Sequence, residues 1–175
     1  MTLEELKTYI RDIRDFPKSG IIFKDITPLL AAGTAFREVV DRIADRYQGT
    51  VDMVLGIESR GFIIGAAVAY RLGLGLALVR KPGKLPAERY AARYELEYGS
   101  DTLEIHRDAF GNCSQVLIVD DLLATGGTAS AAIELVHRLD GKVAGCAFII
   151  ELAFLEGRRR LDTPEIFSLL TYDHE

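Results

Sequence analysis

Hydrophobic residues recur along the chain with two kinds of spacing, and these spacings predict its helices and strands. Apolar residues three or four positions apart predict amphipathic helices, whereas short apolar runs predict buried strands. The predicted helices cover 3–13, 35–47, 60–72 and 128–139, and the predicted strands cover 51–57, 75–79, 115–119, 142–150 and 166–171. Residues 16–20 break the first helix, and 21–28 form an irregular segment that ends at Pro28.

This order of elements predicts one α/β domain that spans 1–175. Where strands alternate with helices, the strands usually form a mostly parallel central sheet flanked by helices on both faces. Of the 175 residues, 49% are hydrophobic and 27% are charged, which is typical of a globular protein and excludes a disordered or fibrous chain. At roughly 150 residues per domain, this length fits a single domain.

Residues 80–101 depart from the pattern because they are too polar for a core. An alternation of period two predicts a two-stranded excursion here, formed by Tyr94, Leu96, Tyr98, Leu103 and Ile105. Five basic residues and one acidic residue give 80–93 a charge of +4, although the whole chain carries −5. This contrast favours a polyanionic ligand, and an ordinary solvated loop is the alternative. The Pro and Gly content favours a mobile lid.

Composition also excludes several classes of function. The net charge of −5 argues against a nucleic-acid partner. Cys113 and Cys146 lie far apart in sequence, so we expect buried thiols in a reducing compartment. The three histidines lack the spacing of metal ligands. The most apolar stretch, 61–79, contains Arg71 and four glycines, so we expect a cytoplasmic protein without a membrane partner.

The segment 116–129 carries the most informative chemistry. Its apolar residues predict a strand that ends at Asp120 and Asp121, and ligands bind at the carboxyl ends of strands in open α/β sheets. The turn that follows can hold a phosphate on the free N–H groups of a helix start, and it consists of Ala124, Thr125, Gly126, Gly127 and Thr128. The two carboxylates can hydrogen-bond vicinal hydroxyls, and the turn beside them can hold a phosphate. A ribose 5-phosphate carries both features. The alternative is a solvated acidic pair before a capped helix.

A second turn joins a predicted strand to a predicted helix, and it consists of Glu58, Ser59, Arg60 and Gly61. Free N–H groups at the helix start and the guanidinium of Arg60 can hold an anion there. An ordinary helix start with Ser59 as its N-cap is the alternative, and the two interpretations are compatible. A nucleophile elbow is not predicted, because Ser59 lies one position too late for G-x-S-x-G.

Several separated segments together resemble one family. The string 116–129 is similar to the phosphoribosyl pyrophosphate (PRPP) signature of type I phosphoribosyltransferases. Four further segments resemble the adenine-specific members of that family and occur in the same order, namely FPKSGIIFKDITP (16–28), GIESRGF (56–62), RKPGKLP (80–86) and LEYG (96–99). The resemblance covers nearly the whole chain, from about 16 to 172.

The resemblance implies transfer of a 5-phosphoribosyl group from PRPP to N9 of adenine, giving AMP and pyrophosphate. It implies that Asp120, Asp121 and 124–128 bind the ribose phosphate, and that 58–61 with Lys81 and Lys84 bind pyrophosphate. Glu97 is implied as the catalytic acid/base, and a solvated carboxylate on a strand is the alternative. Phe23 is implied to stack on adenine, and the backbone of Ile22 to contact its edge. The implied cofactor is Mg²⁺, bound mainly through substrate and water.

The resemblance further implies a type I phosphoribosyltransferase fold that forms a homodimer. A base-binding hood is expected at about 1–34 and a flexible catalytic lid at about 80–106. Residues 21–23 could equally belong to the core, and for Ile21 we expect that place. Lys24 stands where many relatives carry Arg. Two alternatives stay open: a transferase for another base, and a non-catalytic PRPP-binding regulator. A regulator would need a nucleic-acid-binding surface, for which the chain has no spare length and no basic face outside the lid.

Overall fold

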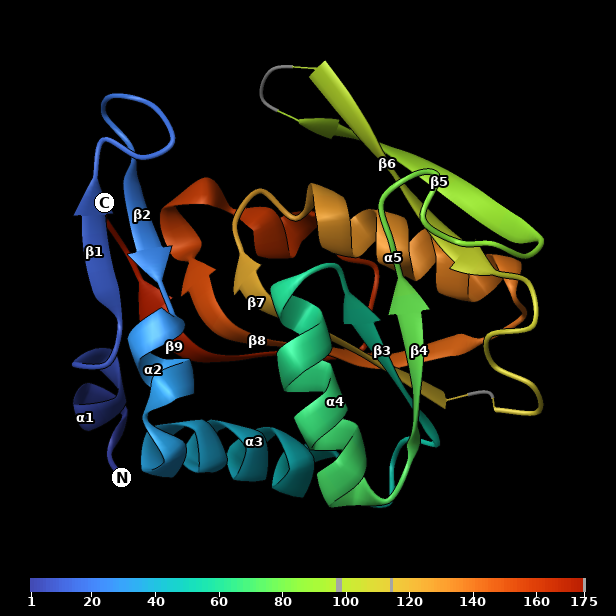
Figure 1. Ribbon diagram of the computed structural model, residues 1–175, viewed down its shortest axis with the longest axis horizontal. Coiled ribbons are helices and arrows are strands. Elements are labelled where there is room, and N and C mark those ends of the chain that lie inside the picture. Colours follow the sequence, from blue (N-terminus) through green and yellow to red (C-terminus); the bar gives the residue numbers. More distant parts are fainter. Residues whose placement is uncertain (97–98, 114, 175) are drawn as a thin grey trace.

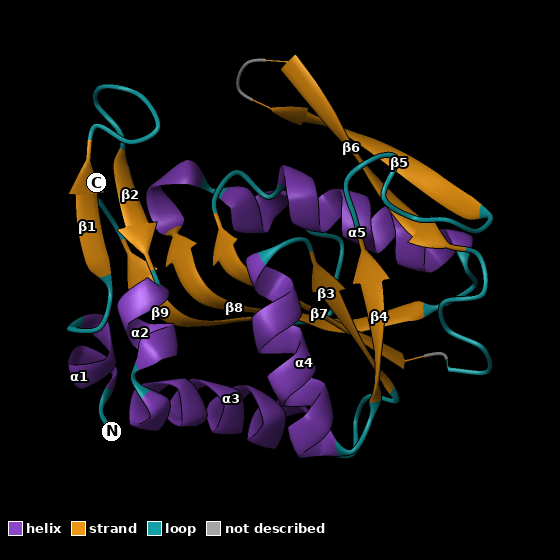
Figure 2. Cartoon of the chain, in the orientation of Figure 1, coloured by secondary structure: helices purple, strands orange, loops and turns teal. Residues whose placement is uncertain are grey.

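The computed structural model describes residues 1–96, 99–113 and 115–174, and a parallel sheet forms its centre (Figures 1 and 2). Within these residues the central sheet has five strands in the order β4 (Gly75–Val79), β3 (Met53–Ile57), β7 (Gln115–Leu123), β8 (Lys142–Leu152) and β9 (Ile166–Tyr172). All neighbouring pairs are parallel. The chain runs outward from β3 to β4 and later outward from β7 to β8, so the strand order reverses between β3 and β7. Such a reversal is where open α/β sheets bind ligands.

Helices cover both faces of this sheet, as predicted (Figure 1). One face packs on α3 (Gly33–Tyr47) and α4 (Arg60–Leu72) through buried side chains such as Val54 and Leu117. The other face packs on α5 (Gly127–Arg138) through Leu55 and Ile118. Successive side chains of a strand point to opposite faces, so covering both faces requires strands that are apolar throughout.

The N-terminal segment forms a small unit that contacts β9. It contains α1 (Leu3–Lys7), α2 (Thr27–Ala31) and an antiparallel pair, β1 (Arg11–Arg14) and β2 (Ile22–Asp25). The predicted helix 3–13 is therefore wrong beyond Lys7, because strand pairing takes over from Arg11. The predicted irregular segment 21–28 is also wrong, since it contains β2 and the start of α2. Apolar spacing over so few residues does not decide between helix and strand.

The predicted two-stranded excursion is confirmed as a hairpin of β5 (Arg89–Leu96) and β6 (Gly99–His106), which packs along α5 (Figure 1). Ala92, Leu103 and Ile105 are buried in the core that the hairpin shares with α5. Arg138 on α5 donates a hydrogen bond to a backbone carbonyl of β5 at 2.8 Å. The expectation that 80–101 is too polar for a core is therefore wrong for Ala92 and for the buried Leu85.

The α/β fold with its mostly parallel sheet is confirmed, and the remaining predicted elements agree to within four residues at their ends. Helix 60–72 and strand 75–79 have the predicted bounds. Cys146 is buried as predicted, but Cys113 is only partly buried. None of the helices in the described part of the chain has the length and apolar character that a bilayer crossing requires.

Candidate functional site

Three loops meet at one edge of the sheet because they follow the carboxyl ends of three neighbouring parallel strands. Residues 58–61 follow β3, 80–84 follow β4, and 124–128 follow β7. Together with the hairpin they surround an open cavity of about 470 Å³. Its lining consists of Glu58, Ser59, Arg60, Lys81, Lys84, Tyr94, Leu103 and 120–129.

The acidic pair contributes to this lining from within β7. The sequence predicted that the strand ends at Asp120 and Asp121. In the structure β7 continues to Leu123, so both residues lie inside the strand. Asp121 is buried and forms an ion pair with Nε of Arg60. Burial raises the pKa of the Asp120 carboxyl well above its usual range, and the charge of Asp121 adds to this shift. Carboxyl groups in this arrangement are suited to hydroxyl groups, which both donate and accept hydrogen bonds.

The turn 124–128 is supported by a segment that the sequence reasoning missed. Gly126 has φ +83°, in the left-handed region that favours glycine, and α5 begins directly after it. Gly157, the first residue of the 3₁₀ helix η2 (Gly157–Arg160), packs against this turn. A Cβ atom on Gly157 would lie 2.0 Å from the carbonyl oxygen of Ala124. Two glycines distant in sequence therefore let backbone pack on backbone beneath the predicted phosphate turn.

An ion pair connects η2 to the end of β8. Nε of Arg158 lies 2.9 Å from Oε1 of Glu151, a buried carboxylate on β8, and a second nitrogen of the same guanidinium contacts the other carboxylate oxygen. Arg158 also donates to a backbone carbonyl at Ile166, the start of β9. The support of the phosphate turn is thus anchored to two strands of the sheet.

Both helices that begin at the cavity lack a side-chain cap. Ser59 occupies the N-cap position of α4, but its side chain makes no capping hydrogen bond, and the N-cap of α5 is Gly126. By contrast, α1 has a complete capping box formed by Thr2 and Glu5. The first turns of α4 and α5 therefore present N–H groups without a side-chain acceptor, and the helix dipole favours an anion there. The alternative of an ordinary helix start capped by Ser59 is not supported.

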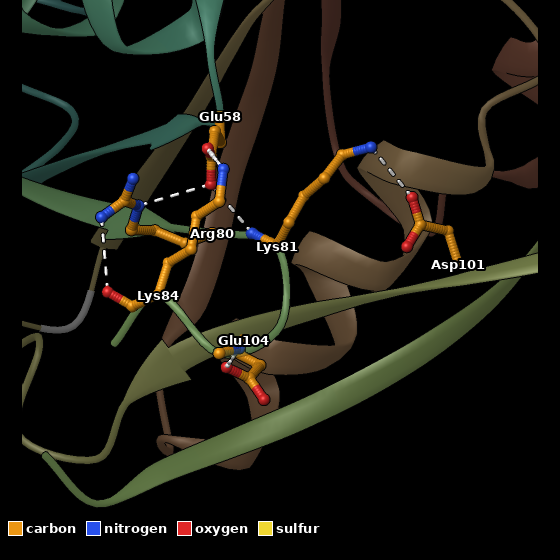
Figure 3. A network of polar contacts seen from close by, with 7 residues as sticks. Glu58, Arg80, Lys81, Lys84, Asp101 and Glu104 are labelled. Atoms are coloured by element: carbon orange, nitrogen blue, oxygen red, sulfur yellow. Dashed lines mark hydrogen bonds and ion pairs between the residues drawn. The ribbon is translucent and has the colours of Figure 1, made fainter. Parts of the chain in front are cut away.

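The basic turn after β4 is bound by carboxylates (Figure 3). Glu58 accepts hydrogen bonds from Nζ of Lys84, from Nε of Arg80 at 3.3 Å and from the backbone N–H of Lys81 at 3.0 Å. Burial by itself would raise the pKa of Glu58, but these three hydrogen bonds outweigh it and lower the pKa to about 2. Nζ of Lys81 pairs with Asp101 on β6 at 3.1 Å. The lysines predicted to bind pyrophosphate thus already have carboxylate partners.

The residues predicted to bind the base lie on β2, beside the cavity. The ring of Phe23 makes an edge-to-face contact with Phe16, with 5.2 Å between ring centroids. The guanidinium of Arg60 lies 5.5 Å from the centroid of Phe23, a cation–π distance. Arg60 therefore contacts both the acidic pair and the predicted stacking residue. Ile22 and Phe23 are partly buried, whereas Ile21 is exposed, so its expected place in the core is wrong.

Lys24 has partners outside the cavity. Its buried ammonium group lies 2.9 Å from Oδ1 of Asp12 and 4.4 Å from the ring centroid of Tyr172. These contacts join β2 to β1 and to the end of β9. Lys24 thus holds the N-terminal unit together.

The structure brings the predicted phosphate and pyrophosphate residues together around one cavity. Gly61 packs directly behind Asp120, where a Cβ would lie 2.9 Å from Oδ1 of that residue. Glu97, the predicted acid/base, lies outside the described residues. The sequence reasoning missed Tyr94, Asp101, Glu104 and Gly157 as parts of the site. Alternating apolar positions placed Tyr94 in a hairpin, but they did not indicate which face of the hairpin meets the cavity.

The side chains at the cavity can be compared with the ligands that the predicted Mg²⁺ would need. Among the described residues, no group of three or more His, Cys, Asp or Glu side chains could hold a metal ion. Asp120 and Asp121 nevertheless supply carboxylate oxygens to the cavity. Mg²⁺ is commonly held by one or two carboxylates together with water and substrate phosphates. These residues therefore fit an ion that is held mainly by a polyphosphate substrate.

Comparisons with known proteins agree with this arrangement. Residues 24–169 match the family described as phosphoribosyl transferase domain. A curated adenine phosphoribosyltransferase from Geobacter metallireducens is 57% identical over 171 residues, which are 97% of this chain and 100% of the relative. The crystal structure of adenine phosphoribosyltransferase from Thermoanaerobacter pseudethanolicus has a TM-score of 0.93 and 53% identity, over 98% of this chain and 100% of that one.

A third relative was solved with ligands. Adenine phosphoribosyltransferase from Saccharomyces cerevisiae, complexed with D-2,5-dideoxy-2,5-imino-altritol 1,6-bisphosphate and adenine, has a TM-score of 0.90 and 42% identity. The match covers 96% of this chain and 98% of that one. Sequence and fold therefore agree over almost the whole length, and the chain belongs to the phosphoribosyl transferase family, among the adenine phosphoribosyltransferases.

Proposed function

We propose that the cavity transfers the 5-phosphoribosyl group of PRPP to N9 of adenine, giving AMP and pyrophosphate in purine salvage. One observation carries this proposal: an acidic pair, an uncapped helix start and a turn with two lysines line the same cavity. A single ligand with vicinal hydroxyls, a 5-phosphate and a pyrophosphate would engage all three features.

The ribose phosphate is assigned to the end of β7 and the start of α5. The 5-phosphate would lie in the turn 124–128, where N–H groups and the hydroxyls of Thr125 and Thr128 can donate to its oxygens. The ribose hydroxyls would hydrogen-bond with Asp120 and Asp121. Because Gly157 supports this turn from behind, the phosphate position is set by backbone atoms.

The pyrophosphate is assigned to the opposite side of the cavity. It would contact the N–H groups of 58–61, the guanidinium of Arg60, and the ammonium groups of Lys81 and Lys84. Mg²⁺, held mainly by the substrate and water and by no assigned side chain of this protein, would supply positive charge to the pyrophosphate. The cationic side chains would stabilise the negative charge that develops on the leaving group.

Adenine is the acceptor of the phosphoribosyl group. A bond forms between N9 of adenine and C1 of the ribose, the bond from C1 to the pyrophosphate oxygen breaks, and the N9 proton passes to a base. We assign that base to Glu97, by family resemblance. Phe23 would stack on the adenine ring, the backbone of Ile22 would contact its edge, and the unit 1–34 would form the hood. The hairpin within 80–106 would act as the lid that excludes water.

The test is an assay of pyrophosphate release from PRPP with adenine, hypoxanthine and guanine, with and without a chelator of Mg²⁺. We expect release with adenine only, since a site that hydrogen-bonds one purine edge rejects a mismatched edge by about 10⁴–10⁵. Comparable kcat/KM for adenine and hypoxanthine would contradict the adenine assignment and leave a transferase for another base. PRPP binding without turnover of any base would favour the regulator.

We further propose that the protein is a cytoplasmic homodimer that pairs through α4 and the edge strand β4. Tyr70 on α4 is 91% exposed, and Ile63 on α4 and Leu78 on β4 are also exposed apolar side chains. Sedimentation equilibrium would measure the assembly. A monomer at micromolar concentration, or a dimer unaffected by Tyr70→Ser and Ile63→Ser together, would contradict this interface.

A further inference from the structure

Glu104 is a buried carboxylate that the proposed reaction does not use. It lies on β6 and is 7% exposed. Its Oε2 accepts a hydrogen bond from the backbone N–H of Gly83 at 3.1 Å and pairs with Nε of Arg89 at 3.0 Å. Its backbone forms a bridge with Arg80, with N–O distances of 2.9 and 2.7 Å. One residue thus binds the chain at positions 80 and 83.

These two positions precede the two lysines of the cavity. Lys81 follows Arg80, and Lys84 follows Gly83. The turn they form is exposed from 81 to 84, and Gly83 adopts φ +79° with no atom within 4 Å of the position of a Cβ. An exposed turn gains little from apolar packing, so its conformation depends on its hydrogen bonds. Two carboxylates supply such bonds: Glu58, which lines the cavity, binds the N–H of Lys81 and Nζ of Lys84, and Glu104, which does not line it, binds the N–H of Gly83. Glu104 can therefore hold the turn without taking a place that the substrate needs.

The chemistry of Glu104 suits this task. An ionised acceptor binds an N–H group more strongly than a neutral one does. Burying a carboxylate is costly unless it is paired, and Arg89 provides the pairing. Because Arg89 balances the charge, Glu104 anchors the turn without adding net negative charge beside Lys81 and Lys84.

We infer that Glu104 is a positioning residue for the leaving pyrophosphate. It acts through the turn 81–84, which it holds so that Lys81 and Lys84 both line the pyrophosphate side of the cavity, and it does not itself touch the substrate. This inference rests on the proposed function. Groups held in place before the ligand arrives lose less entropy on binding, so freeing the turn weakens pyrophosphate binding specifically.

The test compares two ligands that occupy different sides of the cavity. AMP would occupy the ribose-phosphate side, and magnesium pyrophosphate would occupy the lysine side. Titration calorimetry measures both in the wild type, Glu104→Ala and Glu104→Gln. In Glu104→Ala we expect pyrophosphate affinity to fall about 10- to 100-fold, as for loss of a hydrogen bond to a charged group. The affinity for AMP should stay within about twofold, since the turn 124–128 is untouched.

The conservative substitution and one control variant sharpen the comparison. Glu104→Gln should lose less pyrophosphate affinity than Glu104→Ala, because the amide oxygen still accepts from Gly83 while the pairing with Arg89 weakens. Asp45→Asn is the control: Asp45 lies on α3, its side chain is 63% exposed, and it pairs with Arg71 at the surface. Its affinities should equal those of the wild type. In steady-state kinetics, KM for PRPP should rise in Glu104→Ala while KM for adenine does not.

Each contrary result has a distinct meaning. Equal losses for AMP and pyrophosphate would make Glu104 a general structural residue, and unchanged pyrophosphate affinity in both Glu104 variants would also overturn the inference. If thermal melting shows that Glu104→Ala does not fold, Glu104→Gln replaces it in the test. Its loss of pyrophosphate affinity is then compared with its loss of AMP affinity. Failure of the proposed function appears separately, because the wild type would then release no pyrophosphate from PRPP and adenine.

Discussion

Lys84 and Glu58 form an ion pair that joins the turn after β4 to the end of β3. Because the pKa of Glu58 is lowered from 4.5 to about 2, its ionised form stabilises the fold. That contribution is complete above pH 4.5 and is lost as the pH falls through about 2. We expect Glu58→Gln to be less stable than the wild type at pH 7, with a difference that shrinks as the pH falls below 4.5.

Urea unfolding of both proteins from pH 7 to pH 3 measures this difference. A difference that stays constant over the whole range would show that the carboxylate charge does not carry the stabilisation. The comparison requires that both proteins unfold in one cooperative transition at each pH, which far-UV and near-UV circular dichroism can check.

Asp120→Asn should increase stability and reduce affinity. The raised pKa of Asp120 means that its ionised form is disfavoured in the folded state, so removing the charge stabilises the protein at pH 7. The amide oxygen still accepts the N–H of Asp121, a bond of 2.9 Å. The amide offers the ribose hydroxyls a different set of donors and acceptors, and loss of one such hydrogen bond should cost about 0.5–1.5 kcal/mol of binding to PRPP. Calorimetry and thermal melting measure the two effects.

Asp121→Asn is the matched comparison, because it should reduce stability as well as affinity. Asp121 is buried and holds the half-exposed guanidinium of Arg60, and the substitution removes the charge that pairs with it. If both Asn variants melted below the wild type and bound PRPP normally, the acidic pair would be structural.

Gly157→Ala should displace the phosphate turn. Its Cβ would lie 2.0 Å from the carbonyl oxygen of Ala124, and backbone atoms cannot rotate away as a side chain would. We expect a loss of roughly 1–3 kcal/mol in stability, as for other overpacked sites, together with weaker binding of AMP. Gly33→Ala is the control, since no atom lies within 4 Å of its Cβ position and it begins a helix. Normal AMP affinity in Gly157→Ala would refute the supporting role of Gly157.

Phe23→Ala should weaken adenine binding by about 1–3 kcal/mol, the range for base–aromatic stacking in nucleic-acid sites. Phe16→Ala should cost less, because Phe16 makes an edge-to-face contact with Phe23 and is not itself assigned to the base. Competition kinetics with adenine analogues measures both. Equal effects of the two variants would indicate that Phe23 orders the hood and does not stack on the base.

Glu97→Gln should lower kcat by about 10²–10⁴, the usual contribution of general acid–base assistance, while PRPP affinity stays unchanged. The amide keeps the size of the side chain and removes its basicity. Unaltered turnover in single-turnover measurements would remove Glu97 from the mechanism.

The sheet and its helices were predictable from the sequence, because a strand that is buried on both faces is apolar at successive positions. Met53–Ile57 is an example. The N-terminal unit was not predictable, since Arg11–Arg14 becomes a strand only through pairing with Ile22–Asp25. The site divides in the same way. Turns that follow strands, such as 58–61 and 124–128, carry local signals in glycine and hydroxyl residues. Gly157 and Glu104 act through contacts across the fold, and no local pattern indicates such contacts.

The carboxylate partners of the cavity cations also determine which anions can compete for it. Arg60, Lys81 and Lys84 are each matched by a carboxylate of this chain, so the unliganded cavity carries little excess positive charge. A monovalent anion such as chloride would displace one carboxylate from one cation, so it would replace one ion pair by another and gain little binding free energy. An anion with several charges on one framework replaces several carboxylates in a single binding event. We therefore expect the cavity to favour polyvalent anions, so that chloride should inhibit the enzyme far less than pyrophosphate does.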